Sequence, residues 1–381
     1  MADNKDKKVL NVPVLRFPEF TEEWKNTTLK NECSINPTSD KLKDEFVYVD
    51  LESVEKGELT KKQVIEKENA PSRAQRVLRN GDVLFQCVRP YQRNNYLVKN
   101  VSSEVQWVAS TGYAQLRTER NNPAFIYHLL NTSSFNKKVI VRCTGSSYPA
   151  INSDDLSKIH FYICGDIEEQ KRIADFLTLL DERIATQNKI IKDWKKLKSA
   201  IYQKIFESLV APTLKLGQIV EIIKGQQVNG TDLLEQGDYY VMNGGTTPSG
   251  WLNTYNTECN TISISEGGNS CGYVQYNTSR YWSGGHCYSL RILNTHETID
   301  LYLYHYLKWQ EGNIMALRIG SGLPNIQKKD LLRFPVILPT ISLQKRIVSI
   351  LNAIEEKVTC ENSITEHFTK HKEYLLNKLF I

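Results

Sequence analysis

The sequence has no long apolar run. No stretch approaches the roughly 18 consecutive apolar residues that cross a bilayer, so no membrane span is predicted. The first eight residues, Met1–Lys8, are mostly polar or charged and have no apolar core, which excludes a secretory signal of the usual kind. We therefore expect a soluble protein of the cytoplasm.

Cysteines occur without the spacing of a structural metal site. The eight cysteines are scattered along the chain, and no two of them form a Cys-x-x-Cys pair. This pattern favours reduced intracellular thiols over a zinc site or a disulfide framework. The sequence predicts no metal site and no cofactor bound by this chain.

Motifs of common DNA-processing enzymes are also missing. None of the twelve prolines precedes an aspartate, and Glu23-Trp24-Lys25 and Glu169-Gln170-Lys171 match only a loose nuclease pattern that chance often supplies. There is no Asn-Pro-Pro-aromatic motif, which would hold a flipped base, and no Gly-x-x-x-x-Gly-Lys-Ser/Thr loop for nucleotide phosphates. We predict that the chain is not an enzyme by itself, with a nuclease of unfamiliar type as one rival.

Length and composition indicate a folded protein of more than one domain. A chain of 381 residues exceeds the usual size of a single domain, and a hydrophobic content of 40% is enough for real cores. The net charge of +5 permits a nucleic-acid partner without demanding one.

An internal repeat organises the sequence. Gln170-Lys171-Arg172-Ile173 recurs as Gln344-Lys345-Arg346-Ile347, and at this offset of 174 residues twelve of the 37 positions from 170 to 206 are identical. Upstream, the loop Gly145–Ile151 matches Gly320–Ile326, and Tyr127-His128 is echoed by Tyr304-His305. The segments between these anchors differ. We therefore divide the chain into head 1 (12–165), a helix (166–208), head 2 (209–340) and a second helix (341–381).

Both repeated segments predict long helices that pack together. Apolar residues recur at alternating spacings of three and four, as in a coiled coil, and neither segment contains proline or glycine. The predicted helix-pair interface comprises Ile173, Leu177, Leu180, Ile184, Trp194 and Ile201 in the first copy and Ile347, Leu351, Ile354, Val358, Phe368 and Leu375 in the second. The same apolar pattern also assigns Leu197 to the seam. For Trp194 and Phe368, core packing is favoured over base stacking.

The heads are predicted to be mixed α+β. Strands are expected at Phe46–Val49, Val83–Phe85 and Val105–Val108 in head 1 and at Tyr239–Met242 and Ile262–Ile264 in head 2. Asn80-Gly81 is a hairpin-type turn signal. A helix is expected late in each head, at Pro123–Asn131 and Leu301–Gln310.

Two α+β heads, each followed by a copy of one long helix, resemble the specificity subunits of Type I restriction-modification systems. The likeness rests on the repeated Gln-Lys-Arg-Ile helix start, on Leu15-Arg16-Phe17-Pro18-Glu19-Phe20, and on the segments Tyr239–Trp251 and Ser265–Tyr276. The resemblance implies target recognition domains that each read half of a split double-stranded DNA site. It also implies two antiparallel helices that separate the heads.

The same resemblance implies the partners. Two methyltransferase (modification) subunits would dock on the helices and restriction motor-nuclease subunits would join them, so S-adenosylmethionine, ATP and magnesium are expected on those subunits and not on this chain. The second helix has little chain beyond it, so the way in which the termini are joined stays open. A coiled-coil scaffold without DNA readout is the alternative function.

Candidate DNA contacts lie on polar, turn-rich segments. Arginine can bind guanine in a bidentate manner, glutamine and asparagine can bind adenine, and all three also bind phosphate. The candidates are Arg73, Arg76, Gln86, Arg89, Tyr91, Arg93 and Asn94 in head 1 and Asn243, Thr246, Thr247, Ser249, Trp251, Asn269, Ser270 and Tyr273 in head 2. An ordinary solvated face or plain hairpin geometry remains the alternative for each. For the repeated Gly145–Ile151 and Gly320–Ile326 loops, structural support is favoured over phosphate contact.

Overall fold

The computed structural model describes residues 11–101, 104–320, 322 and 324–381. The chain forms two compact units, one of residues 1–188 and 363–381 and the other of residues 189–362. Each unit contains one head and part of both long helices, so the predicted boundaries at 166, 209 and 341 remain predictions. In the described part of the chain, no helix has the length and apolar character of a membrane span.

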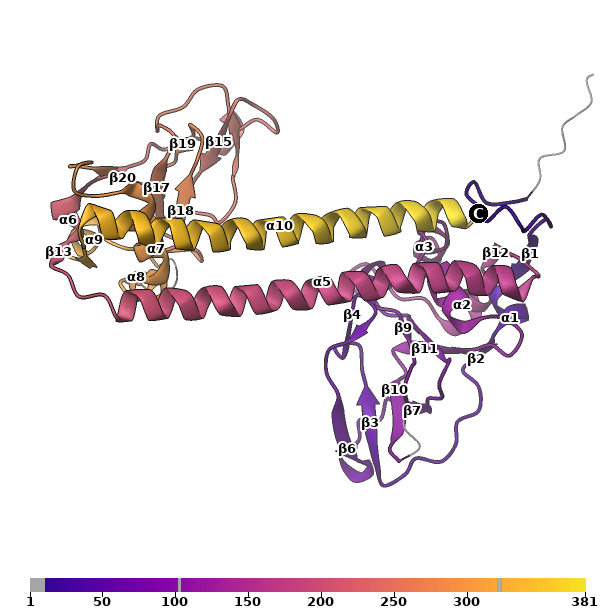
Figure 1. The fold of residues 1–381 in the computed structure, drawn as a ribbon. Helices are drawn as coiled ribbons and strands as arrows, with labels where there is room; N and C mark the ends of the chain where they lie inside the picture. The colour runs from indigo at the N-terminus through magenta and orange to yellow at the C-terminus, as the bar shows by residue number, and fades with distance from the viewer. Residues whose placement is uncertain (1–10, 102–103, 321, 323) are drawn as a thin grey trace, which may run out of the picture. The chain divides into compact units, whose positions relative to one another are not determined.

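Two uninterrupted helices dominate the structure: α5 (Ile167–Glu207) and α10 (Ile341–Leu379) (Figure 1). In the first unit the start of α5 packs beside the end of α10, and the Arg183 guanidinium lies 5.6 Å from the centre of the Phe368 ring. In the second unit the end of α5 contacts the start of α10, where the Tyr202 hydroxyl donates to Glu355 Oε1 at 2.9 Å. These contacts confirm the predicted α+β class with two long helices in antiparallel contact.

Head 1 contains two four-stranded sheets and two smaller ribbons. The strand orders are β2-β11-β8-β9 and β6-β3-β10-β7, and the ribbons are β1-β12 and β4-β5. The strands are β1 (Lys25–Thr28), β2 (Ser34–Ile35), β3 (Glu45–Val49), β4 (Val54–Glu55), β5 (Glu58–Leu59), β6 (Gln63–Glu66), β7 (Ala74–Val77), β8 (Val83–Gln86), β9 (Tyr96–Leu97), β10 (Gln106–Ser110), β11 (Tyr113–Arg117) and β12 (His160–Ile163). The helices are α1 (Leu29–Glu32), α2 (Pro123–Leu130), α3 (Ser133–Ile140) and α4 (Ser153–Ser157), with 3₁₀ turns η1 (Lys67–Asn69) and η2 (Pro90–Gln92).

Head 2 has a four-stranded and a three-stranded sheet. Their strand orders are β14-β20-β17-β18 and β16-β15-β19, beside the ribbon β13-β21. The strands are β13 (Thr213–Lys215), β14 (Val220–Lys224), β15 (Tyr239–Met242), β16 (Gly250–Leu252), β17 (Thr261–Ser265), β18 (Val274–Asn277), β19 (Trp282–Ser283), β20 (Cys287–Ile292) and β21 (Pro335–Ile337). The helices are α6 (Leu216–Ile219), α7 (Asp300–Trp309), α8 (Glu311–Met315) and α9 (Lys328–Leu332), with the 3₁₀ turn η3 (Gly230–Asp232).

The predicted strands and head helices are confirmed, but one predicted turn type is wrong. Asn80-Gly81 does form a turn, with Gly81 at φ 90° and Asp82 N donating to Arg79 O at 3.1 Å. However, β7 and β8 on either side belong to different sheets, so the turn passes the chain from one sheet to the other and closes no hairpin.

The core of the first unit joins the two ends of the described chain. Trp24 and Phe125 are buried with Leu177 of α5 and Phe380, whose ring centre lies 6.1 Å from that of Trp24. The Leu15 backbone N–H donates to Lys378 O at 2.9 Å. The N-terminal segment and the end of α10 are therefore held together by backbone pairing and aromatic packing.

Candidate nucleic-acid interface

The repeated glutamine at the start of each long helix anchors that helix to its head. Gln170 Oε1 accepts from Asn122 N at 2.8 Å, and its Nε2 donates to Cys164 O at 2.9 Å. Gln344 Oε1 accepts from Ile299 N at 2.8 Å, and its Nε2 donates to Glu297 O and Pro339 O, both at 2.8 Å. Both side chains are buried. The repeat therefore marks a shared structural joint.

The N-terminal motif docks on the same joint in the first unit. Arg16 makes a bidentate ion pair with Glu169, with Nε–Oε1 at 2.7 Å and a terminal nitrogen to Oε2 at 2.8 Å. The Phe17 ring packs edge-on against Phe176 at 6.3 Å. Such a bidentate pair fixes geometry as well as adding energy, so this motif sets how the N-terminal segment lies on α5.

The two repeated loops support equivalent turns in the two heads. In head 1, Ile151 N donates to Cys87 O at 3.0 Å and Arg89 N donates to Pro149 O at 2.8 Å. In head 2, Ile326 N donates to Glu266 O at 2.8 Å and Gly268 N donates to Pro324 O at 3.0 Å. The loops therefore support these turns, whereas the structural role favoured from the sequence was support for the helix that follows. Ser321 and Leu323 of the second loop lie outside the described residues.

We name the supported turns the head 1 turn (Arg89–Asn94, after β8) and the head 2 turn (Gly268–Tyr273, after β17). They carry four head 1 candidates, Arg89, Tyr91, Arg93 and Asn94, and three head 2 candidates, Asn269, Ser270 and Tyr273. The structure thus brings these sequence candidates to equivalent places in the two heads.

Within the head 1 turn, Tyr91 is 54% exposed and the Arg89 guanidinium lies 4.4 Å from the centre of the Tyr148 ring. Asn94 Oδ1 accepts from Lys56 N at 3.0 Å. Gln86 is only 2% exposed, and its amide bonds Asn94 N at 3.0 Å and Gln92 Oε1 at 2.8 Å. The structure therefore gives Gln86 an internal role, shaping the turn, in place of the predicted contact with DNA.

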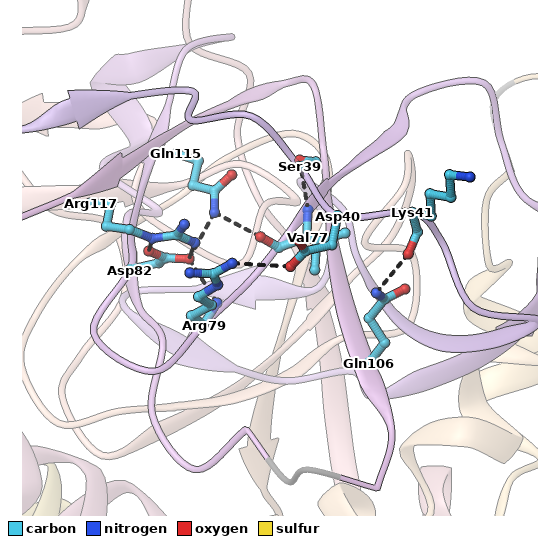
Figure 2. Close-up of polar contacts among 9 residues, drawn as sticks. All are labelled: Ser39, Asp40, Lys41, Val77, Arg79, Asp82, Gln106, Gln115 and Arg117. Carbon is cyan, nitrogen blue, oxygen red and sulfur yellow. Dashed lines mark hydrogen bonds and ion pairs between the residues drawn. The ribbon is translucent and has the colours of Figure 1, made fainter.

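A buried carboxylate organises the rest of the arginine-rich segment (Figure 2). Asp82 is 1% exposed and accepts from Arg117 Nε at 2.7 Å, Gln115 Nε2 at 2.7 Å and Arg79 N at 2.7 Å. The hydrogen bond with Asp82, partly opposed by burial, raises the pKa of Arg117. This network joins the end of β7, the start of β8 and β11.

The same network occupies part of the predicted arginine cluster. Figure 2 shows Arg79 reaching Asp40, at 3.1 Å, while Gln106 Nε2 donates to Lys41 O at 3.1 Å. Arg76 Nε donates to Tyr113 O at 3.0 Å, and burial lowers the pKa of its guanidinium. Arg76 thus has a structural partner across the sheets, whereas Arg73 is exposed.

The other head 2 candidates lie around β15 and β16. Asn243 Oδ1 accepts from His286 N at 3.1 Å, which orders the turn after β15, and Thr246, Thr247 and Ser249 are exposed. Trp251 packs edge-on against Tyr240 at 6.3 Å. On the head 2 turn, the Lys308 ammonium lies 4.1 Å from the centre of the Tyr273 ring, and burial raises the pKa of Tyr273.

The predicted helix-interface residues are mostly covered. Ile173, Leu177, Ile347, Leu351 and Ile354 are buried, whereas Leu180, Ile184, Trp194, Ile201, Val358, Phe368 and Leu375 are half-buried. Leu197 was assigned wrongly, because it is 46% exposed and Tyr202 and Phe206 fill the second core in its place. Each helix faces its head as well as the other helix, which widens the buried stripe beyond a simple coiled-coil seam.

Sequence reasoning missed a polar cluster that occurs once in each unit. His128 of α2 lies 3.2 Å from Thr178 Oγ1 and 3.9 Å from Asp181 Oδ2 of α5, and Asp181 pairs with Lys372 of α10. The matching set in the second unit is His305, Asn352, Glu355 and Lys198, with His305 Nε2 2.8 Å from Asn352 Oδ1 and Lys198 Nζ 2.6 Å from Glu355 Oε1. The echo of Tyr127-His128 in Tyr304-His305 was the available signal.

The titration of these groups follows their burial and partners. Burial, followed by the nearby Lys372 and Lys99, lowers the pKa of His128 to about 3, and burial also lowers the pKa of His305. Burial raises the pKa of Asp181 despite Lys372. Burial opposes the charge of Glu355 as well, but Lys198 and the Tyr202 hydroxyl stabilise that charge and lower its pKa. Both histidines are therefore neutral, and each connects its head to the long helices.

The sequence contains one His-x-x-x-His pair, His367 and His371 on α10, which are one helical turn apart. Among the residues that the structure describes, no group of three or more His, Cys, Asp or Glu side chains could hold a metal ion. The pair therefore has no third protein ligand of these types in the described chain.

The chain matches one protein family over most of its length. The family described as the Type I restriction modification DNA specificity domain matches residues 21–193 and 212–369. A putative type I specificity subunit of Mycoplasma pneumoniae is 35% identical over 167 residues, which are 43% of this chain and 44% of that protein. The chain thus matches less than half the length of this relative. A putative type I restriction enzyme specificity subunit of Methanocaldococcus jannaschii is 23% identical and aligns with 95% of this chain and 93% of that protein.

Solved structures share the fold. The crystal structure of the S subunit of a Type I restriction-modification system from M. genitalium has a TM-score of 0.66 at 18% identity and covers 97% of this chain and 99% of that one. A chain from a study of complex assembly in the type I system has a TM-score of 0.58 at 23% identity, covering 93% of this chain and 97% of that one. The two family matches cover most of the chain and show that it belongs to the family of Type I restriction-modification DNA specificity subunits, the non-catalytic components of those systems.

Proposed function

We propose that this chain reads a split DNA target, with one half-site per head. The observation that carries the proposal is the pair of equivalent turns, each supported by a copy of the same loop and each presenting different residues. A shared support with different exposed side chains is what two readers of different sequences require. Exposed Lys and Arg would neutralise phosphates for affinity, and polar side chains would read base edges.

The long helices would set the gap between the half-sites and dock the partners. A helix of 41 residues is about 60 Å long at roughly 1.5 Å per residue. Two methyltransferase subunits on the helices would bring S-adenosylmethionine for adenine methylation, and restriction motor-nuclease subunits would bring ATP and magnesium, in the cytoplasm. Family membership supports this assembly, as does the likeness to a chain studied for complex assembly of the type I system.

The direct test is the methylation pattern that the chain directs. Cells that express it with its methyltransferase partner should acquire methyladenine in one motif of two short half-sites around an unread gap, measured by single-molecule sequencing. A chain that assembles with the methyltransferase yet directs no sequence-selective binding or methylation would instead be a coiled-coil scaffold.

The role of α5 as a spacer has its own test. Inserting four residues after Thr186 adds about one helical turn, or roughly 6 Å, and should lengthen the gap by about one or two base pairs at roughly 3.4 Å each. Both half-site sequences should stay the same. Changed bases at an unchanged gap would contradict the spacer role.

A further inference from the structure

Two arginines of the head 1 turn have an unusual backbone conformation. Arg89 and Arg93 both have a φ of 54°, in the left-handed region. Three of the other described non-glycine residues with positive φ are asparagines, Asn36, Asn100 and Asn260, and asparagine tolerates this region well. The fourth is Lys56. In every residue but glycine the Cβ approaches the following carbonyl oxygen here, and arginine and lysine lack the short polar side chain by which asparagine compensates with a local hydrogen bond.

The head 2 turn has glycine at the two corresponding positive-φ positions. Gly268 and Gly272 have φ of 77° and 91°. The first internal hydrogen bond is the same, from Gln92 N to Arg89 O at 3.0 Å in head 1 and from Cys271 N to Gly268 O at 3.1 Å in head 2, but Arg93 N bonds Pro90 O whereas Gly272 N bonds Ser265 O. The turn can therefore be built with glycine, and head 1 holds arginine at both positions.

The packing of head 1 gives little reason for these arginines. Within the described part of the chain, the Arg93 guanidinium has no hydrogen-bond or ion-pair partner, and the Arg89 guanidinium contacts the Tyr148 ring, which is itself 63% exposed. By contrast, Arg79 and Arg117 both have carboxylate partners inside the head. Strain that persists without an internal partner points to an external one.

We propose that Arg89 and Arg93 are the residues by which the head 1 turn binds acceptor oxygens and nitrogens of DNA, either the O6 and N7 of guanine or backbone phosphate oxygens. Head 2 uses glycine here and bonds its Gly268 and Gly272 N–H groups internally, so its turn would approach DNA through the short side chains of Asn269 and Ser270. This inference rests on the proposed reading of DNA and names the chemistry of that site.

Replacing either arginine with glycine separates binding from stability. Arg93→Gly removes the guanidinium and also the strain, so the melting temperature should stay the same or rise, whereas specific binding should weaken about 5- to 150-fold. Arg89→Gly should weaken binding similarly, but its melting temperature should gain less because the contact with the Tyr148 ring is lost. Asn100→Gly is the first control, because it also places glycine at a positive φ but removes no charge. Lys30→Ala is the second, because it removes the charge of an exposed lysine of α1 without changing a positive φ.

The measurement is binding of the full-length chain, assembled with its methyltransferase, to duplexes randomised in each half-site, at two salt concentrations. A base contact should relax one position of one half-site, and Arg93→Lys should not restore it, because lysine lacks the bidentate fork. A phosphate contact should weaken all sequences alike, reduce the salt slope by about one, and be largely restored by lysine.

Two results would overturn the inference. Binding and preference equal to the wild type in both glycine variants would make the arginines dispensable, and a clear loss of stability in Arg93→Gly would give that residue a structural role. If the wild-type complex itself shows no preference in either half, the proposed function fails, and that outcome is distinct because it does not depend on any variant.

Discussion

Head 1 and head 2 each contain a four-stranded sheet with the same order of equivalent strands, β2-β11-β8-β9 in one and β14-β20-β17-β18 in the other. Their second sheets differ, with four strands in head 1 and three in head 2, although both contain a parallel pair, β3 with β10 and β15 with β19. The first sheet packs with the long helices in each unit's core.

The comparison teaches which parts of a head are free to change. Residues that join a head to the helices recur in both copies, such as Gln170 and Gln344, or His128 and His305. Away from this joint, side chains differ even where the backbone bonds are the same, as Arg89 and Gly268 show. A reader whose support is constant can change its exposed residues without disturbing the joint.

The largest effect is expected from a charge placed in the helix contacts. Leu180→Asp and Ile354→Asp are equivalent substitutions, one in each unit, at a half-buried and a buried position. Each should lower the free energy of unfolding by about 2–5 kcal/mol, because apolar packing is lost and an unpaired carboxylate is placed in the helix contacts. Chemical denaturation followed by circular dichroism measures this, and co-purification with the methyltransferase should fail.

Leu179→Asp is the matched control for that experiment, since Leu179 is a neighbouring leucine of α5 that is exposed. Its stability should change little. Normal stability of Leu180→Asp, or equal losses in both leucine variants, would contradict the assigned packing.

Removing the repeated glutamine should affect both units alike. Gln170→Leu removes the partner of one backbone N–H and one carbonyl, and Gln344→Leu removes the partner of one N–H and two carbonyls, at about 1–3 kcal/mol for each group left buried. We expect urea unfolding to show similar losses for the two variants. Lys171→Leu and Lys345→Leu, at the exposed neighbouring positions, should be close to neutral. A loss of stability in only one of the two glutamine variants would contradict the equivalence of the two joints.

The buried histidines predict a smaller, pH-dependent effect. The pKa of His128 is lowered to about 3 in the folded chain, against about 6.5 when unfolded, so below about pH 6.5 the unfolded state binds a proton that the folded state does not. The free energy of unfolding should therefore fall as the pH drops from about 6.5 towards 3, by up to about 1.4 kcal/mol per pH unit for this group. His305 should act in the same direction.

Unfolding of His128→Asn and His305→Asn measured between pH 7 and pH 5 checks this. Each variant should be less stable at pH 7 but should show a flatter pH dependence than the wild type. An unchanged slope would mean that Asp181 and Lys372, or Glu355 and Lys198, dominate the titration of these clusters.

The sequence by itself determined the repeat, the two long helices and most strands. These features follow from local rules. A long stretch without Pro or Gly, in which apolar residues recur at spacings of three and four, predicts a helix, and the duplication is seen directly as identical residues at a fixed offset. Recurrence within divergent surroundings also indicated a shared task for Gly145–Ile151 and Gly320–Ile326, but that both loops bond the turns after β8 and β17 came from the structure.

Only the tertiary structure decided which arginine side chains have a hydrogen-bond or ion-pair partner within head 1. Arg76, Arg79, Arg89 and Arg93 look alike in the sequence, but Arg79 meets Asp40 and Arg76 meets Tyr113 O, partners 39 and 37 residues away. Leu197 was misassigned for the same reason, because the face a helix buries depends on the head beside it as well as on its partner helix. Such contacts form between segments far apart in the chain, so neither residue type nor spacing encodes them.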